Sequence, residues 1–107
     1  MESDCVLVWT TIGTTADWRG MASILVAERL AACVNALPEM ESTYRWQGNI
    51  EVSGERQLVI KTTSARIDAL RTRVLELHSY ELPEFIVVPI AGGSDAYLNW
   101  IRASTAG

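Results

Sequence analysis

The sequence predicts an α+β fold in which two helices cover one face of a four-stranded antiparallel sheet. Segments with strand and helix patterns follow one another in the order β-α-β-β-α-β, and a short helix comes last. The two prolines inside predicted strands, Pro38 and Pro89, fall in segments that this fold places at the sheet edges, where a missing backbone donor is tolerated. No linker, repeat or low-complexity segment interrupts the 107 residues, so we expect a single domain, 1–107.

The first predicted elements are a strand and a helix. Residues 6–10 form a nearly continuous apolar, β-branched run, which is typical of a buried strand. Either Thr14 or Thr15 then caps a helix expected over 18–32, whose apolar positions share one face. Asp17 lies in the expected first turn, where a negative charge interacts favourably with the helix dipole.

A long hairpin is predicted next. Its first strand, 33–46, is interrupted at Pro38 and alternates thereafter. Residues 47–49 form the turn, because Gly and Asn both tolerate a positive φ. The chain returns over 50–52, breaks at a Ser-Gly pair and forms the third strand over 57–62.

The last part of the chain predicts a second helix, a fourth strand and a final helix. Thr63 or Ser64 caps the second helix, which ends near His78 and carries a regular apolar stripe. The fourth strand is expected over 85–90 and the short final helix over about 94–102.

This order of elements is the ferredoxin-like pattern, and right-handed crossovers give its sheet the strand order 4-1-3-2. Strands one and four are apolar on both faces, although the two helices can cover only one face. We therefore expect further copies of the chain to cover the open face. The hairpin that carries Trp46 and Gly48 is the segment expected to reach a neighbour.

The composition argues against several classes of function. The net charge is −4 and Lys61 is the single lysine, so there is no basic stripe for nucleic acid, and the third strand lacks the aromatic residues of an RNA-binding sheet. No apolar run approaches the roughly 20 residues that span a bilayer, so we expect no membrane partner. The acidic start of the chain, with Glu2 and Asp4, is unlike a signal peptide, and we expect a cytoplasmic protein whose Cys5 and Cys33 are free thiols.

Five strings, in order and in register from about residue 5 to residue 103, closely resemble the CutA (divalent-cation tolerance) family. They are Glu28–Asn35, Tyr44–Gly48, Ile60–Thr63, Leu77–Glu84 and Tyr97–Ile101. The resemblance implies a ferredoxin-like homotrimer packed through its long hairpins. It also implies a link to tolerance of copper and other divalent cations, and an architecture similar to the PII signalling trimers.

The resemblance also implies a candidate metal site. Copper prefers imidazole and thiolate ligands, and the candidates here are His78 and Cys33, with Glu81 nearby. In some bacterial relatives the ligands are a cysteine ending strand one and two adjacent histidines ending helix two. The matching positions in this chain are Thr10 and Leu77-His78, so only one histidine of that set is present. The alternative interpretation of His78 is a polar cap at the helix C-terminus.

A second candidate site is a cleft between subunits. The amphipathic residues at positions matched to the family are Lys61, Tyr44, Tyr80, Glu84, Tyr97 and Trp100. Aromatic rings and one cation can bind a small anion or nucleotide in such a cleft. The alternatives are interface packing for the rings and a structural ion pair between Lys61 and Glu84.

These patterns favour a non-enzymatic protein. The sequence has no nucleophile-elbow string and no Gly-rich phosphate loop, which also argues against an acylphosphatase-like enzyme on this fold. We therefore expect a homotrimer associated with divalent-cation tolerance, with copper or another divalent cation as the candidate ligand. The alternative is a PII-like sensor that binds a small molecule or anion in its inter-subunit clefts.

Overall fold

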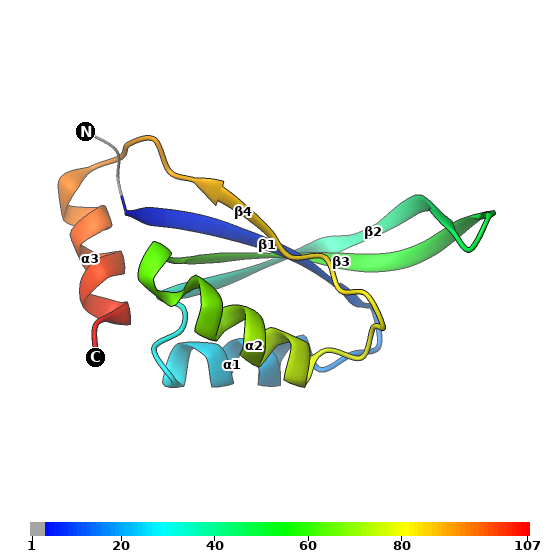
Figure 1. Ribbon diagram of the computed structural model, residues 1–107, viewed down its shortest axis with the longest axis horizontal. Coiled ribbons are helices and arrows are strands. Elements are labelled where there is room, and N and C mark those ends of the chain that lie inside the picture. The colour runs from blue at the N-terminus through cyan, green and yellow to red at the C-terminus, as the bar shows by residue number, and fades with distance from the viewer. Residues whose placement is uncertain (1–3) are drawn as a thin grey trace.

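The computed structural model describes residues 4–107 and has the predicted α+β architecture (Figure 1). Its elements, in chain order, are β1 (Cys5–Gly13), α1 (Trp18–Ala27), β2 (Cys33–Trp46), β3 (Asn49–Thr63), the short 3-10 helix η1 (Ser64–Arg66), α2 (Ile67–Leu77), β4 (Ile86–Pro89) and α3 (Asp95–Thr105).

The four strands form one antiparallel sheet in the order β2-β3-β1-β4, which confirms the predicted order 4-1-3-2 read from the other edge. Strands β2 and β4 are the edges, and they are the strands that carry the prolines. Pro38 lies where the pairing register of β2 and β3 shifts, between Ala36 and Glu39. A proline cannot donate a ladder hydrogen bond, so an edge strand at an irregularity is where it disturbs the sheet least.

Helices α1 and α2 lie side by side beneath one face of the sheet (Figure 1). Alternate residues of β1 and β3, including Val8 and Ile60, point toward these helices and meet Leu25, Leu70 and Val74 in one buried cluster. Truncating a fully buried side chain of this kind to alanine costs about 2–5 kcal/mol, so this layer is the main source of stability.

The opposite face of the sheet is covered only at one end. Helix α3 packs there through Leu98 and Ile101 against Cys5. Elsewhere on that face the pairs Leu7–Val88 and Trp9–Ile86 remain partly open, and Ile86 is 50% and Val88 39% exposed. The strands therefore carry apolar residues on both faces, as predicted, and within residues 4–107 no element other than α3 covers the second face.

Helix α1 ends earlier than predicted, at Ala27 and not at Ala32. The reason is Arg29, which adopts a left-handed conformation with φ 61°, a common way for a helix to end. The backbone N–H groups of Leu30 and Ala31 then both donate hydrogen bonds to the Leu25 carbonyl. The predicted threonine cap is also wrong. The cap is Asp17, whose carboxylate accepts a hydrogen bond from the Gly20 N–H at 2.9 Å.

Strand β3 is continuous over Asn49–Thr63, so the predicted break at Ser53-Gly54 is wrong. Both residues stay in the ladder because they pair with Ser42 and Glu41 of β2. Beyond this point β1 has ended, and the hairpin continues as a two-stranded arm that projects from the domain (Figure 1). The predicted turn at its tip is present, but the positive φ values occur at Gln47 and Gly48, as in a type I′ turn, and not at Asn49, which begins β3.

Three smaller details of the later elements also differ from the prediction. Helix α2 follows the 3-10 helix η1, and neither Thr63 nor Ser64 caps it with a side-chain hydrogen bond. Strand β4 is limited to Ile86–Pro89, so Phe85 and Ile90 lie outside it. The final helix extends to Thr105 rather than ending near Arg102.

Candidate ligand-binding cleft

A cleft of about 700 Å³ lies between the hairpin arm and the loop that leads from α2 to β4. Its aromatic and charged lining residues are Tyr44, Arg45, Trp46, Glu55, Tyr80, Glu81, Glu84 and Phe85. The volume is within the range of small-molecule sites, and the mixture of rings with a few charged groups is typical of them. The charged groups of this lining are three carboxylates and one guanidinium.

Tyr80 is the central residue of the cleft wall. Burial raises the pKa of its phenol to about 12, and hydrogen bonding to Glu55, the charge of Glu55 and the proximity of Tyr44 act in the same direction. The phenol is therefore protonated at neutral pH. The ring also contacts the His78 ring, with centroids 4.7 Å apart.

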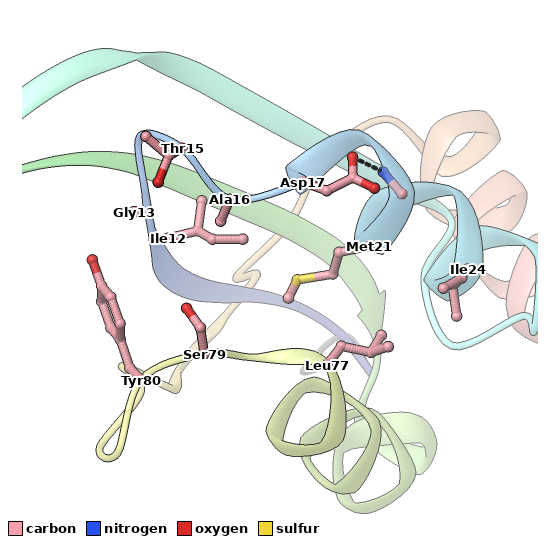
Figure 2. A pocket seen from close by; sticks show the side chains of 11 residues that line it. Ile12, Gly13, Thr15, Ala16, Asp17, Met21, Ile24, Leu77, Ser79 and Tyr80 are labelled. Carbon is pink, nitrogen blue, oxygen red and sulfur yellow. Dashed lines mark hydrogen bonds between the residues drawn. The ribbon is translucent and has the colours of Figure 1, made fainter.

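A second cavity, of about 560 Å³, is also lined by Tyr80 (Figure 2). It is bounded by the segment that joins β1 to α1 and by the residues after α2, and Met21 and Leu77 point into it. The Asp17–Gly20 cap hydrogen bond closes one side. The one carboxyl group in the lining of this cavity is that of Asp17.

His78 forms hydrogen bonds that connect the loop between α2 and β4 to the sheet. Its Nε2 lies 2.6 Å from the Thr11 carbonyl oxygen, and its Nδ1 accepts the Tyr80 backbone N–H at 3.0 Å. These two partners assign the neutral tautomer with the proton on Nε2. Both ring nitrogens are thus occupied in structural hydrogen bonds, and neither has a lone pair directed to a metal ion.

The predicted metal candidates are not brought together. Cys33 pairs through Lys61 with Leu7, whereas His78 reaches Thr11, which is about 13 Å further along β1 at 3.3 Å per residue. The Cys33 thiol instead lies 3.7 Å from the Asn35 side-chain oxygen.

Among residues 4–107 no three His, Cys, Asp or Glu side chains are close enough to hold a metal ion. Glu81 lies on the cleft loop without a second ligand. The Thr10 hydroxyl is buried in the core. The residues present therefore do not fit the copper site that the family resemblance implies.

The six predicted cleft residues divide into two groups. Tyr44, Tyr80 and Glu84 line the cleft together. The other three form a separate cluster at the opposite end of the open sheet face, where the Lys61 Nζ lies 3.2 Å from the Tyr97 hydroxyl and the Tyr97 and Trp100 ring centroids are 5.3 Å apart.

The predicted ion pair between Lys61 and Glu84 is absent from the described chain. The Glu84 carboxylate instead accepts a hydrogen bond of 2.8 Å from the Gln57 side-chain amide, which also donates to the Thr10 carbonyl. The predicted interface residues Trp46 and Gly48 lie in the arm, Trp46 in the cleft wall and Gly48 in the turn at the tip.

Two polar residues at the cleft were not predicted from the sequence. Glu55 lines the cleft, and Gln57 donates a hydrogen bond to the cleft residue Glu84. Both lie on the open face of β3, on the same side of the strand as Val59 and Lys61. The alternation of faces along a continuous strand predicts this placement, but the expected break at Ser53-Gly54 excluded Glu55 from the strand. Glu55 is only 8% exposed, and it lies close enough to Tyr80 to raise the pKa of that phenol.

The fold and the cleft define a class of protein: a ferredoxin-like α+β domain with a projecting hairpin arm and a cleft at the base of that arm. Comparison with known proteins gives the family. The profile described as CutA1 divalent ion tolerance protein matches residues 6–104, and the chain belongs to this family.

Curated relatives agree with this assignment. The divalent-cation tolerance protein CutA of Thermus thermophilus is 43% identical over 99 residues, covering 92% of this chain and 96% of the relative. The chloroplastic protein CutA of Arabidopsis thaliana is 40% identical over 100 residues, covering 94% of this chain. The chain spans only about half, 55%, of that plant relative.

Solved structures show the same fold. CutA from Xylella fastidiosa superposes with a TM-score of 0.92 at 45% identity, covering 96% of this chain and 99% of that chain. CutA1 from Shewanella sp. SIB1 gives a TM-score of 0.93 at 36% identity and covers all of both chains. None of the helices within residues 4–107 is long and apolar enough to cross a membrane.

Proposed function

We propose that this protein is a non-enzymatic homotrimer that binds a small molecule in clefts near its subunit interfaces and acts in the response to divalent cations through that ligand. The observation that carries the proposal is the 700 Å³ cleft with aromatic and charged walls, which lies next to the half-exposed sheet face. This is the sensor alternative that the sequence analysis left open.

Assembly is supported by the open apolar face. Ile86 and Val88 of β4 are exposed by 50% and 39% on this face, and the arm residues Ile50 and Val52 are exposed by 71% and 58% on the other face of the arm. Apolar surface of this extent favours burial against another subunit. Copies related by rotation bury the same patches in every subunit, so a closed ring satisfies all of them.

A binding role fits the chemistry of the cleft better than a catalytic one. The single histidine has both nitrogens engaged, and the Tyr80 phenol, with a pKa of about 12, holds its proton at neutral pH. The polar groups that remain are suited to recognition of a ligand. We propose no nucleic-acid or membrane partner, and the cytoplasmic location stays a prediction.

Two measurements test this proposal. Sedimentation equilibrium is expected to give the mass of three chains, and a monomer would contradict the assembly. A thermal-shift screen of nucleotides, small anions and organic cations is expected to find ligands that Tyr44→Ala weakens. Tyr97→Ala is the matched control, because Tyr97 is equally exposed, at 43% against 41%, but lies in the other cluster.

Calorimetric titration with Cu²⁺ tests the copper hypothesis separately. We expect His78→Ala and the wild type to bind Cu²⁺ with the same affinity, because the imidazole nitrogens are already occupied. A tenfold loss of affinity in the variant would show that His78 leaves its hydrogen bonds to ligate the metal.

A further inference from the structure

Most of the charged side chains that line the cleft are negative. Glu55, Glu81 and Glu84 contribute three carboxylates, and Arg45 contributes one guanidinium. No basic side chain in residues 4–107 forms an ion pair with any of these three carboxylates. Their negative charge is therefore not neutralised within the described chain, and an anion entering the cleft would be repelled.

Burial strengthens this effect at the inner end of the cleft. The Glu55 side chain is 92% removed from solvent, and its partner is the uncharged Tyr80 phenol. Glu84 is partly buried and its partner is the uncharged Gln57 amide. A carboxylate that is buried with only neutral partners gains most from an opposite charge, because little water competes for it.

Aromatic rings form the walls of the cleft. Tyr44, Trp46, Tyr80 and Phe85 line the same cleft. The faces of such rings attract cations, and rings that surround a cavity together are the usual means of holding an alkylated ammonium group. The Tyr44 ring is held in place because its hydroxyl is hydrogen-bonded to Ser53 at 2.8 Å.

The carboxylates of the cleft do not form a metal-ligand cluster. No three His, Cys, Asp or Glu side chains in the described residues are close enough to hold one ion. A bare divalent ion needs several oxygen atoms at 2.0–2.6 Å, roughly, around one point. An organic ammonium ion of several carbon atoms can meet separated carboxylates and rings at once.

We propose that the cleft binds an organic ammonium ion, with Glu55 and Glu84 as the anionic partners and the Tyr44 and Tyr80 rings as walls. This inference rests on the proposed ligand-binding function and names the chemical class of the ligand. It also reverses the sign expected from the sequence, which pointed to a small anion near Lys61. Lys61 lies in the separate cluster with Tyr97, away from this cleft.

Isothermal titration calorimetry with putrescine and with tetramethylammonium chloride tests the proposal. We expect both to bind the wild type, and sodium acetate and tert-butanol not to bind in the same range. Glu55→Gln and Glu84→Gln are each expected to weaken putrescine about tenfold, since each removes one charge-assisted contact. Tyr44→Leu is expected to weaken tetramethylammonium about threefold.

Glu76→Gln is the matched control, because it removes the same charge from the exposed face of α2 and is expected to leave both affinities unchanged. Glutamine at position 55 still accepts the Tyr80 hydroxyl, so the fold is retained, and thermal unfolding of each variant verifies this. Equal affinities in the wild type and both cleft variants, or tighter binding of acetate than of putrescine, would overturn the inference.

The oligomeric state, measured by light scattering on the same samples, separates this inference from the proposed function. A trimer that binds neither ammonium ion overturns the inference alone. A monomer that binds putrescine through Glu55 overturns the proposed assembly and supports the inference, because one chain forms the whole cleft.

Discussion

Thr10 in β1 and Thr62 in β3 offer a matched test of how a buried hydroxyl contributes to stability. Both side chains are fully buried on the helix-covered face of the sheet. The Thr62 hydroxyl donates to the Leu30 carbonyl at 2.8 Å, whereas in the described chain the Thr10 hydroxyl has no hydrogen-bond partner. Valine replaces each hydroxyl by a methyl group of similar size and keeps the β-branched shape.

The two substitutions are expected to have opposite signs. In the unfolded state both hydroxyls are hydrated, and burying one without a partner costs about 1–3 kcal/mol. Thr10→Val removes that cost, so we expect a stabilisation of about 1 kcal/mol. Thr62→Val removes a satisfied hydrogen bond and leaves the Leu30 carbonyl without this donor, so we expect a destabilisation of about 1–2 kcal/mol.

Urea unfolding at one fixed protein concentration measures both changes, since assembly makes apparent stability depend on concentration. The expected result is a higher midpoint for Thr10→Val and a lower midpoint for Thr62→Val, with equal slopes. If Thr10→Val lowers the midpoint as Thr62→Val does, the Thr10 hydroxyl has a partner in solution and the reasoning is refuted.

Three further predictions concern the cap, the open face and one ion pair. Asp17→Ala is expected to lower the unfolding free energy by about 1 kcal/mol, because it removes the cap of α1. Thr15→Ala is expected to change the unfolding free energy little. Equal effects of the two substitutions in urea unfolding would show that Thr15 also caps the helix. Ile86→Glu is expected to reduce the mass in light scattering to that of one chain, since it places a charge on the open face, and an unchanged mass would locate the interface elsewhere. The hydrogen bond from Arg102, at 2.7 Å, lowers the pKa of Asp4 below 3.8, so this pair contributes stability above that pH and loses it as the pH falls through the lower, folded pKa. Arg102→Gln is expected to remove this part of the acid dependence in thermal unfolding, and an unchanged profile would contradict it.

The fold was predictable where the conformational preference of a residue agrees with its position in the sheet. The position of Pro38 and Pro89 identified the two edge strands, and the structure has β2 and β4 there. The end of α1 was not predictable, because the left-handed conformation that ends it occurs at Arg29, and arginine gives no such signal. The break expected at Gly54 was wrong because cross-strand pairing with Glu41 holds that glycine in the ladder.

The candidate site was predictable only in part. Residue types pointed to Tyr44, Tyr80 and Glu84, and the structure places these together. Lys61 was grouped with them because it is the single lysine and stands at a position matched to the family, but the register of β3 directs it to the Tyr97 cluster. The hydrogen bonds of His78 to Thr11 and Tyr80 were not predictable either, since the partners of an imidazole are set by tertiary contacts that no local string records.

The two cavities share Tyr80 as a common wall. Turning the Tyr80 ring therefore changes the shape of both cavities at once. A guest that turns the ring as it binds in the acidic cleft alters the second cavity, and a guest in the second cavity has the converse effect. Two such guests would influence each other without touching, and each would change the affinity of the other by the same factor, because a coupling free energy is reciprocal.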